Sequence, residues 1–505
     1  MEKVIRRALV SVYHKEGLAE ILKLLHEQGV EFVSTGGTST FIEGLGYPCV
    51  AVEDLTKYPS MLGGRVKTLH PAIQGGILAR RGHETDQKEV LEYGLSLIDL
   101  VIVDLYPFEA TVASGASEED IIEKIDIGGI SLIRGAAKNF EDVVIIPSQA
   151  DYATLLEILR ERGARTTLEE RRHFARRAFA VSSHYDSAIF RYFDGEERSE
   201  LRLTADEAKP LRYGENPHQK GVFYGDLDRY FEQLHGKELS YNNLQDVEAA
   251  VSLIQDFSEP TFAILKHNNA CGCASRPTLL EAWTDALAGD PVSAFGGVLV
   301  ANRPIDVATA REIDKLFLEV LIAPDFEAEA LTILEGKKNR ILLRQKEAID
   351  ARWSYRSMLG GVLAQETDRA VETTAEMKPV TKVAPMAEEL TDLVFATKLV
   401  KHSKSNAIVL GKGGQLIASG VGQTSRVDAL KQAIEKARHF GFDLKGAVLA
   451  SDAFFPFDDC VTLAAEAGIT AIAQPGGSVR DADSIAAADR LGVAMVMTGV
   501  RHFKH

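Results

Sequence analysis

The chain has 505 residues, enough for more than one domain, and its composition is that of a globular protein. Its formal net charge of −16 disfavours a general nucleic-acid binder, which would present a basic surface. This charge still permits a small anionic ligand, because a few local Lys and Arg side chains can dominate one pocket. The chain contains no run of about 18 apolar residues, so we expect no membrane span.

The start of the chain and its cysteines indicate a compartment. Lys3, Arg6 and Arg7 precede a short strand-like run rather than an apolar segment with a cleavage site, so we expect no signal peptide. The four cysteines include no C-x-x-C pair, and Cys271 and Cys273 have no partners at zinc spacing. We therefore predict reduced thiols, no metal site and a cytoplasmic location.

Apolar runs alternate with helical spacing in the first 150 residues. Residues 16–28 have the apolar spacing of a helix, and Gly29 follows as its cap. The predicted strands are residues 8–13, 30–34, 98–105 and 142–147. Strands that alternate with helices predict a parallel, doubly wound sheet, and therefore an α/β fold.

A polar stretch at residues 195–209 follows a long, charged, amphipathic helical segment. We place a domain boundary after residue 200, which gives domains of residues 1–200 and 201–505. The second domain is also mixed α/β, and the polar segments 336–349 and 365–385 are candidates for a further division. Its predicted strands are residues 261–265, 297–301, 406–410, 446–450 and 470–473.

Two glycine-containing segments of the first domain are candidates for phosphate binding. Ser34 to Thr38 joins a strand to a helix, where free N–H groups favour phosphate, although an ordinary tight turn explains the pattern equally well. Arg65 and Lys67 follow a Gly-Gly pair, and alternation points both cations to one side; a solvated basic loop is the alternative. Lys15 follows the first strand, where ligands of such sheets bind.

Residues 124–139 contain a second glycine-rich helix start, which Asp126 precedes. Ser131, Arg134 and Lys138 recur at i, i+3 and i+7 and therefore share one helix face. Tyr106 directly follows the strand at 98–105. Tyr106, Asp126 and Lys138 are candidate proton donors and acceptors, although Tyr106 taken alone is more simply a partly buried aromatic.

The sharpest feature of the second domain is the segment Lys266-His267-Asn268-Asn269, directly after a predicted strand. A His near neutrality can take a proton from a weak amine, and an adjacent Lys can stabilise an oxyanion. A lone His is usually structural, but this combination at a strand end favours catalysis.

Other segments of the second domain suit binding. Residues 211–219 and 239–246 are rich in hydrogen-bonding groups, and 451–459 combines aromatics, Pro and acids. Residues 411–414 (GKGG) indicate a hairpin rather than a phosphate loop. Arg501 binds phosphate only if the C-terminal tail docks, whereas a frayed tail is the usual case.

The order of these motifs closely resembles that of the bifunctional phosphoribosylaminoimidazolecarboxamide (AICAR) formyltransferase/IMP cyclohydrolase family of purine biosynthesis. The match runs from SVYHK at Ser11 to the final RHFKH, and its most specific motifs are GGRVKTLHP, LRYGENPHQ, SDAFFPF and GVRHFKH. The resemblance implies a methylglyoxal-synthase-like N-terminal domain that closes the purine ring. It implies a duplicated, cytidine-deaminase-like C-terminal domain that transfers a formyl group from 10-formyltetrahydrofolate. A homodimer acting on small nucleotides and folate is implied, with no nucleic acid, membrane, redox cofactor or metal.

The resemblance also assigns site residues. In the cyclohydrolase site it implies proton-transfer and oxyanion contacts from Lys67, Tyr106, Asp126 and Lys138. The nucleotide there would be held by Lys15, Thr35, Gly36, Gly37, Thr38, Arg65 and Thr68, with Lys67 beside them. In the transformylase site His267 would be the base and Lys266 its electrostatic partner. The residues lining that site would be Arg212, Tyr213, Phe295, Gly296, Glu319, Asn406, Arg426, Phe454 and Arg501.

The chain departs from the usual family pattern at four places: Tyr13-His14-Lys15 in place of Ser-Asp-Lys, Asp104 in place of Asn, Ala270 in place of Pro, and Asp458 in place of Arg. Three of these departures motivate an alternative, a monofunctional cyclohydrolase or a nucleotide-sensing protein with a degenerate second site. The intact Lys266-His267 pair favours two activities.

Overall fold

The computed structural model describes residues 2–205 and 207–505, and the chain divides into two compact units. Unit 1 is Met1–Asp206 and unit 2 is Glu207–His505, whereas the sequence places the boundary after residue 200. Both units are built from sheets covered by helices, which confirms the predicted α/β class. Within the described residues, no helix is both long and apolar enough to cross a membrane.

The sheet of unit 1 has five strands in the order β4-β3-β2-β5-β6, and every neighbouring pair is parallel. The predicted parallel, doubly wound sheet is thereby confirmed. The strands are β2 (Arg7–Val12), β3 (Glu31–Ser34), β4 (Cys49–Ala51), β5 (Leu100–Asp104) and β6 (Val144–Ile146). The chain starts at β2, adds β3 and β4 on one side, and returns to add β5 on the other. The strand order therefore reverses between β2 and β5, where sheets of this kind bind ligands.

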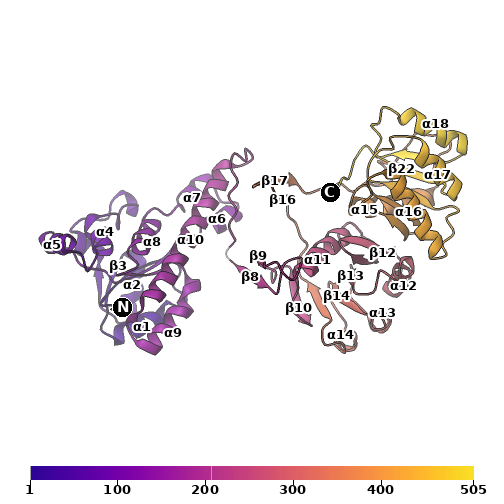
Figure 1. Ribbon diagram of the computed structural model, residues 1–505. Coiled ribbons are helices and arrows are strands. Elements are labelled where there is room, and N and C mark those ends of the chain that lie inside the picture. The colour runs from indigo at the N-terminus through magenta and orange to yellow at the C-terminus, as the bar shows by residue number, and fades with distance from the viewer. Residues whose placement is uncertain (1, 206) are drawn as a thin grey trace. The chain divides into compact units, whose positions relative to one another are not determined.

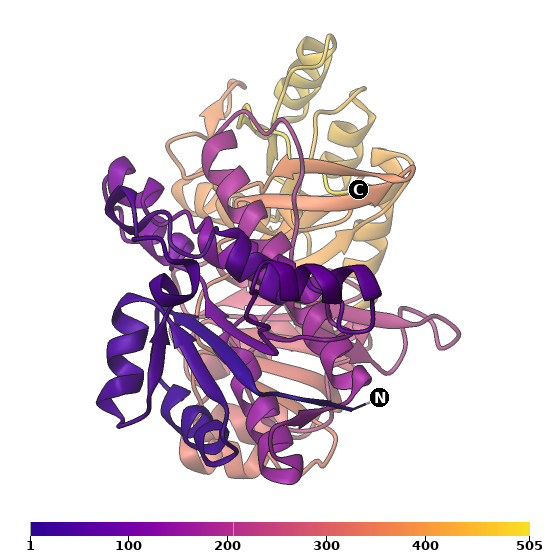
Figure 2. The same cartoon turned by 90° about the vertical axis from the view of Figure 1, so that its left-hand side faces the viewer.

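Helices cover both faces of this sheet (Figures 1 and 2). They are α1 (Leu18–Glu27), α2 (Gly36–Gly44), α3 (Val52–Thr56), α4 (Pro71–Leu78), α5 (Glu84–Glu92), α6 (Phe108–Ala113), α7 (Glu118–Ile122), α8 (Gly128–Lys138), α9 (Tyr152–Arg162) and α10 (Leu168–Asp194). Helix α1 packs beside α9, and α8 packs beside α4 and α10. Leu18, Ile21, Leu22 and Leu25 recur at helical spacing and are fully buried, so α1 is held by one apolar face.

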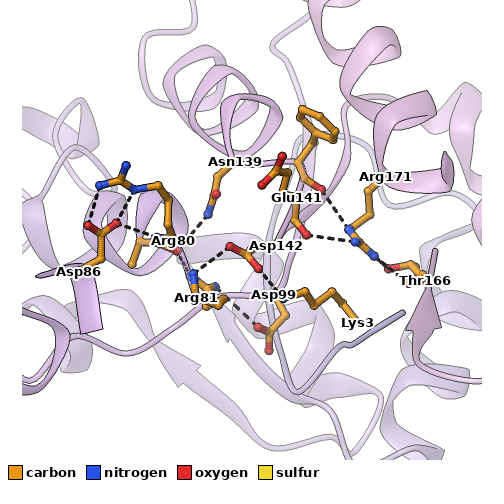
Figure 3. A network of polar contacts seen from close by, with 12 residues as sticks. Lys3, Arg80, Arg81, Asp86, Asp99, Asn139, Glu141, Asp142, Thr166 and Arg171 are labelled. Atoms are coloured by element: carbon orange, nitrogen blue, oxygen red, sulfur yellow. Dashed lines mark hydrogen bonds and ion pairs between the residues drawn. The ribbon is translucent and has the colours of Figure 1, made fainter. Parts of the chain in front are cut away.

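A network of charged side chains lies at the amino ends of β5 and β6 (Figure 3). Asp99 accepts from the backbone N–H of Arg6 at 2.9 Å, and Asp142 accepts from Lys3 Nζ at 2.6 Å. Arg81 donates to the Ile98 carbonyl oxygen at 2.7 Å. Arg171 is 1% exposed. Its guanidinium donates to the backbone carbonyl oxygens of Phe140, Glu141 and Thr166. Because these groups satisfy one another, this edge of the sheet is structural.

The large sheet of unit 2 contains the same strand order twice. In the first copy the order is β12-β11-β13-β14-β15, and in the second it is β20-β19-β21-β22-β23. In both copies the first three strands pair antiparallel and the last three pair parallel. The copies join where β12 pairs with β20. This repeat agrees with the duplicated domain that the resemblance implies.

The first copy comprises β11 (Thr261–Lys266), β12 (Asn269–Ser275), β13 (Gly297–Ala301), β14 (Leu318–Ala323) and β15 (Ile341–Gln345), with α11 (Tyr241–Ile254), α12 (Leu279–Gly289), α13 (Val307–Ile313) and α14 (Ala328–Leu334). The second comprises β19 (Ile408–Lys412), β20 (Gln415–Gly420), β21 (Val448–Ser451), β22 (Ala471–Gln474) and β23 (Ala494–Met497), with α15 (Ala387–Lys401), α16 (Arg426–His439), α17 (Asp459–Ala467) and α18 (Asp481–Leu491). Short strands β10 (Phe231–His235) and β18 (Lys378–Pro379) cover the two ends of the sheet.

One of the two expected dividing segments is part of the core. Residues 336–349 contain β15, whose Ile341, Leu342 and Leu343 are fully buried in a parallel pair with β14. The expectation of a division there is wrong, because charged residues flank a strand too short to dominate the composition. The segment 365–385 does lie between the two copies.

A hairpin between the two copies forms a sheet of its own (Figure 1), and its Arg356 donates to the carbonyl oxygen of His505 at 3.3 Å. Its strands, β16 (Trp353–Met358) and β17 (Gly361–Glu366), pair with each other in a separate two-stranded sheet. Tyr355, Leu359 and Leu363 are exposed. Strands β8 (Ala208–Leu211) and β9 (Gly221–Tyr224) form a second small sheet near the start of unit 2.

The C-terminal tail docks on unit 2 instead of fraying. His502 is 2% exposed, and its Nδ1 and Nε2 lie 2.6 Å and 2.8 Å from carboxylate oxygens of Asp368 and Glu372. The backbone N–H of Ser405 donates to the carbonyl oxygen of Lys504 at 3.0 Å, and the backbone N–H of Lys504 donates to Ser405 Oγ at 3.0 Å. Burial alone would lower the pKa of His502, but the two carboxylates outweigh it and raise the pKa to about 9.

The stability of unit 2 is therefore expected to depend on pH through His502. The pKa is about 9 in the folded chain and 6.5 ordinarily, so its stabilisation is complete below pH 6.5 and is lost as the pH rises through 9. Urea unfolding of the chain and of His502→Asn, at several pH values between about 6 and 10, measures this. The difference between the two proteins should shrink as the pH rises. A difference that stays constant with pH would contradict the assignment.

Candidate active sites

A cavity of about 860 Å³ opens at the carboxyl ends of β2, β3 and β5 in unit 1, where the strand order reverses. Its wall includes most of the residues expected in the cyclohydrolase site: Lys15, Thr35, Gly36, Gly37, Thr38, Arg65, Lys67, Thr68, Tyr106 and Asp126. Segments far apart in the sequence are thus brought to one place by the parallel sheet.

The cavity is suited to an anion. Its wall contains four cations, Lys15, Arg65, Lys67 and Lys124, against three carboxylates, Asp104, Glu123 and Asp126. Helices α2 and α8 begin there at Gly36 and Gly128. Free N–H groups at helix starts and a cluster of cations both favour a phosphate group. Burial lowers the pKa of Lys15, while the negative charge of Asp104 opposes that shift.

The loop before α4 holds its cations close to the start of α2. A Cβ placed on Gly36 would lie 3.9 Å from Lys67 Nζ, so this ammonium faces the Gly36 backbone. Gly64 has φ 98°, and a Cβ there would come within 2.8 Å of Lys67 Cε. The loop therefore requires glycine at Gly64. Arg65 forms an ion pair with Glu123, which precedes α8.

The groups for proton transfer lie at the start of α8. Asp126 Oδ1 accepts from the backbone N–H of Gly129 at 2.6 Å. Burial raises the pKa of Asp126, although backbone hydrogen bonds from Gly129 and Tyr106 oppose it. Burial also raises the pKa of Tyr106, to which the nearby Asp126 charge adds. Asp126 is thus a stronger base than an ordinary carboxylate, and Tyr106 keeps its proton at neutral pH.

Lys138 is not among the residues that line this cavity. It is the last residue of α8 and is exposed, whereas Gly128 at the first turn of α8 borders the cavity. Ten residues at about 1.5 Å each separate the two by about 15 Å, which exceeds the reach of a lysine side chain. The helix face that Lys138 shares with Ser131 and Arg134 contacts other helices: Ser131 accepts from Gln74, and Arg134 donates to Ser182.

Three lining residues, Tyr13, Asp104 and Lys124, are not among the predicted site residues, although the first and second are departures from the family pattern. Tyr13 meets the Tyr106 ring edge-on at 5.7 Å, and Lys124 Nζ lies 5.3 Å and 5.8 Å from the centres of these two rings. Asp104 lines the same wall at the end of β5. Proximity in sequence was the available signal, because Tyr13 and Lys124 each stand two residues from a predicted site residue, Lys15 or Asp126.

In unit 2, Lys266 and His267 lie at a tight turn between β11 and β12. His267 has φ 52° and Asn268 has φ 65°, so both central residues of this two-residue hairpin are left-handed. His267 is exposed at the tip. Lys266 Nζ donates to the carbonyl oxygens of Phe295 and Gly296, at 3.1 Å and 2.8 Å. An ammonium has three N–H donors, so one remains for a reacting oxygen.

Hydrogen bonds connect this turn to the other motifs of unit 2. The Asn268 backbone N–H donates to Asp246 Oδ1 at 2.7 Å, at the start of α11. Asn269 Oδ1 accepts from the backbone N–H of Lys404 at 2.9 Å. Residue 405 in turn bonds to the C-terminal tail. The turn, the segment 401–406 and the tail thus form one hydrogen-bonded group.

Arg426 and Asn406 belong to a buried network beside that group. Arg426 donates to Asn406 Oδ1 at 2.8 Å and to Ser451 Oγ at 3.0 Å, and it forms an ion pair with Asp452. The backbone N–H of His502 donates to the Asp452 carbonyl oxygen at 3.0 Å. Arg426 is only 7% exposed, so its guanidinium is a buried group that connects Asn406, Ser451 and Asp452.

The remaining predicted residues of unit 2 occupy several positions. Phe295 is exposed against Phe317, while Gly296 donates to the Phe317 carbonyl at 2.8 Å. Glu319 instead pairs with Lys237 Nζ at 2.5 Å. Arg212 and Tyr213 follow β8, with the guanidinium over the tyrosine ring. Phe454 is half-buried after β21, and Arg501 is exposed beside Phe503. Contacts within the chain thus place Lys266, Phe295 and Gly296 together, and Asn406 with Arg426.

Comparison with known proteins identifies the family. A family model described as AICARFT/IMPCHase bienzyme matches residues 136–436, which is more than half of the chain, and one described as MGS-like domain matches residues 17–131.

Among residues 2–205 and 207–505, no group of three or more His, Cys, Asp or Glu is arranged to hold a metal ion.

Full-length relatives indicate the same family. The bifunctional purine biosynthesis protein PurH of Bacteroides thetaiotaomicron is 67% identical, over 100% of this chain and 99% of the relative. Proteins of the same name from Chlorobium luteolum and Chloroflexus aurantiacus are 47% and 48% identical over 100% of this chain and 100% and 99% of the relatives. The chain therefore belongs to the AICARFT/IMPCHase bienzyme family.

Proposed function

We propose that the two activities of this bifunctional formyltransferase and cyclohydrolase are divided between the units. Unit 2 transfers a formyl group from 10-formyltetrahydrofolate to the amine of AICAR, and unit 1 closes the formylated product to inosine monophosphate. The observation that carries the assignment of ring closure is the anion-binding cavity of unit 1, with Asp126 and Tyr106 in its wall.

Ring closure needs a base, an acid and a held phosphate. The carboxamide nitrogen attacks the formyl carbon and loses one proton. The formamido nitrogen loses a second proton as its C=N bond forms and the C–O bond breaks, and the oxygen, which has gained two protons, leaves as water. Asp126, whose pKa burial raises, takes the proton from the attacking nitrogen. Tyr106 or Lys67 donates to the departing oxygen. We assign this donor role to wall residues rather than to Lys138, because α8 holds Lys138 at its far end.

Residues 1–206 alone are expected to convert the formylated nucleotide to inosine monophosphate, because the whole cavity wall lies inside unit 1. Absorbance or chromatography of the product, with purified fragment, measures this. The matched control is the fragment with Asp126→Asn, which should lose activity by a factor on the order of 10² or more. A folded, inactive wild-type fragment would show that ring closure is not contained in unit 1.

Formyl transfer needs deprotonation of a weak, conjugated amine. As this amine attacks the formyl carbon, His267 takes its proton, and the folate nitrogen accepts a proton as the carbon–nitrogen bond breaks. Lys266 stabilises the oxyanion with the N–H that the Phe295 and Gly296 carbonyls leave available. The exposed position of His267 at a hairpin tip supports this role, because a substrate can approach it.

His267→Ala is expected to lower formyl transfer by a factor on the order of 10²–10⁴ and to leave ring closure unchanged. Separate assays of the two steps measure this, with His439→Ala, an exposed His in the same unit, as the control. Transfer that stays within a few-fold of wild type would exclude His267 as the base. A wild-type chain without any formyl transfer would instead favour the monofunctional alternative.

We propose further that the enzyme is a cytoplasmic homodimer. The hairpin β16–β17 supports the dimer, since an isolated two-stranded sheet is marginal without packing and this one exposes Tyr355, Leu359 and Leu363. A second copy of the chain would cover these side chains. The location is supported by the cysteines, all four of which are free thiols.

The family resemblance implies formyl-transfer sites that form across the dimer interface. Replacing Leu359 and Leu363 with Glu is therefore expected to give a monomer that has lost formyl transfer but retains ring closure, whose cavity lies within unit 1. Sedimentation and the two separate assays measure this, with Leu91→Glu, an exposed position in unit 1, as the control. A variant that remains dimeric would show that the hairpin is not the interface.

A further inference from the structure

The two departures from the family pattern in unit 1 are in direct contact with each other. His14 follows β2 and Asp104 ends β5, and these adjacent parallel strands pair Val12 with Asp104. His14 Nδ1 lies 2.6 Å from Asp104 Oδ2, and the His14 backbone N–H donates to the same oxygen at 2.8 Å. Two changes that look like independent losses in the sequence therefore form one interaction.

The contact leaves the other carboxylate oxygen for a ligand. Asp104 lines the cavity, and its side chain is 14% exposed, whereas that of His14 is 42% exposed. Both donors from His14 reach Oδ2, so the carboxylate cannot rotate freely and its Oδ1 keeps a fixed direction. A carboxylate can only accept, so the matching group on a ligand must be a donor.

The negative charge of Asp104 also raises the pKa values of two other ionisable groups in the cavity wall, Lys15 and Asp126. Its negative charge opposes the burial that lowers the pKa of Lys15. Burial raises the pKa of Asp126, and the charge of Asp104 adds to that rise. A displaced Asp104 would weaken both effects, so its position matters to the nucleotide and to the base.

We propose that His14 is a positioning residue for Asp104, and that Asp104 so held accepts a hydrogen bond from a hydroxyl or N–H group of the nucleotide in the unit 1 cavity. This rests on the proposed ring closure in unit 1. The two departures compensate for each other, because His14 supplies a hydrogen-bond donor where Asp104 can only accept. The cyclohydrolase site is then an altered site and not a degenerate one.

Four variants test this through ring closure over a range of nucleotide concentrations. His14→Ala leaves Asp104 without its partner, and His14→Asp places two carboxylates together, so each should raise KM about 10-fold or more. His14→Asn should stay within about 3-fold, because its amide N–H can replace the imidazole donor. The double variant His14→Asp with Asp104→Asn should recover most of the loss of His14→Asp, because the repulsion is gone.

The control is His83→Ala, which removes another exposed His beside a carboxylate: His83 Nδ1 lies 2.9 Å from Asp86 Oδ1, and neither residue lines the cavity. It should leave KM unchanged. A wild-type KM for His14→Ala, or no recovery in the double variant, would overturn the proposal. Failure of the wild-type chain to close the ring would instead overturn the proposed function. If His14→Ala does not fold, His14→Asn and the double variant still decide the question.

Discussion

In the account proposed above, the site of unit 1 depends on attraction between a nucleotide phosphate and the strand-to-helix turns that line its cavity. Parallel strands place their carboxyl ends at one edge, so the turns after β2, β3 and β5 meet there. The chain carries a net charge of −16, yet four cations and two helix starts line this cavity, together with the carboxylates of Asp104, Glu123 and Asp126. Cations are therefore concentrated locally in a chain that is acidic overall.

The same edge also sets the chemistry. Asp126 is held by the first turn of α8, where burial makes its carboxylate more basic, and Tyr106 follows β5 close to it. The opposite edge carries a closed network around Asp99, Asp142 and Arg171, in which the polar groups satisfy one another. One end of the sheet is thus structural, and the other carries the proposed catalytic residues.

Unit 2 shows how a repeated fold can confine chemistry to one copy. The corresponding hairpins are β11–β12 and β19–β20. The first carries Lys266 and His267 at its turn, whereas the second carries Gly413 and Gly414, and its Lys412 donates to the carbonyl oxygen of Lys445. The proposed catalytic pair therefore occurs at only one of these two turns.

Much of this could be predicted from sequence, for physical reasons. Buried parallel strands such as β5 are continuous apolar runs, and glycine beside cations marks a phosphate turn. Strand β15 was missed because charged residues flank its three apolar ones. The resemblance implies a role for Lys138, whereas helix periodicity indicates only the face that this residue shares with its neighbours. Its distance from the start of α8 could therefore not be predicted from that pattern. The contact between His14 and Asp104 was hidden, because 90 residues separate two side chains that only the sheet brings together.

The central claim is that unit 1 binds a nucleotide through its phosphate at the carboxyl edge of the sheet. Titration calorimetry with inosine monophosphate and with inosine, on the same chain and at the same salt, tests it most directly. We predict that the monophosphate binds at least about 100-fold more tightly than the nucleoside, and that this ratio falls as salt is added. Equal affinities for the two ligands would contradict the account.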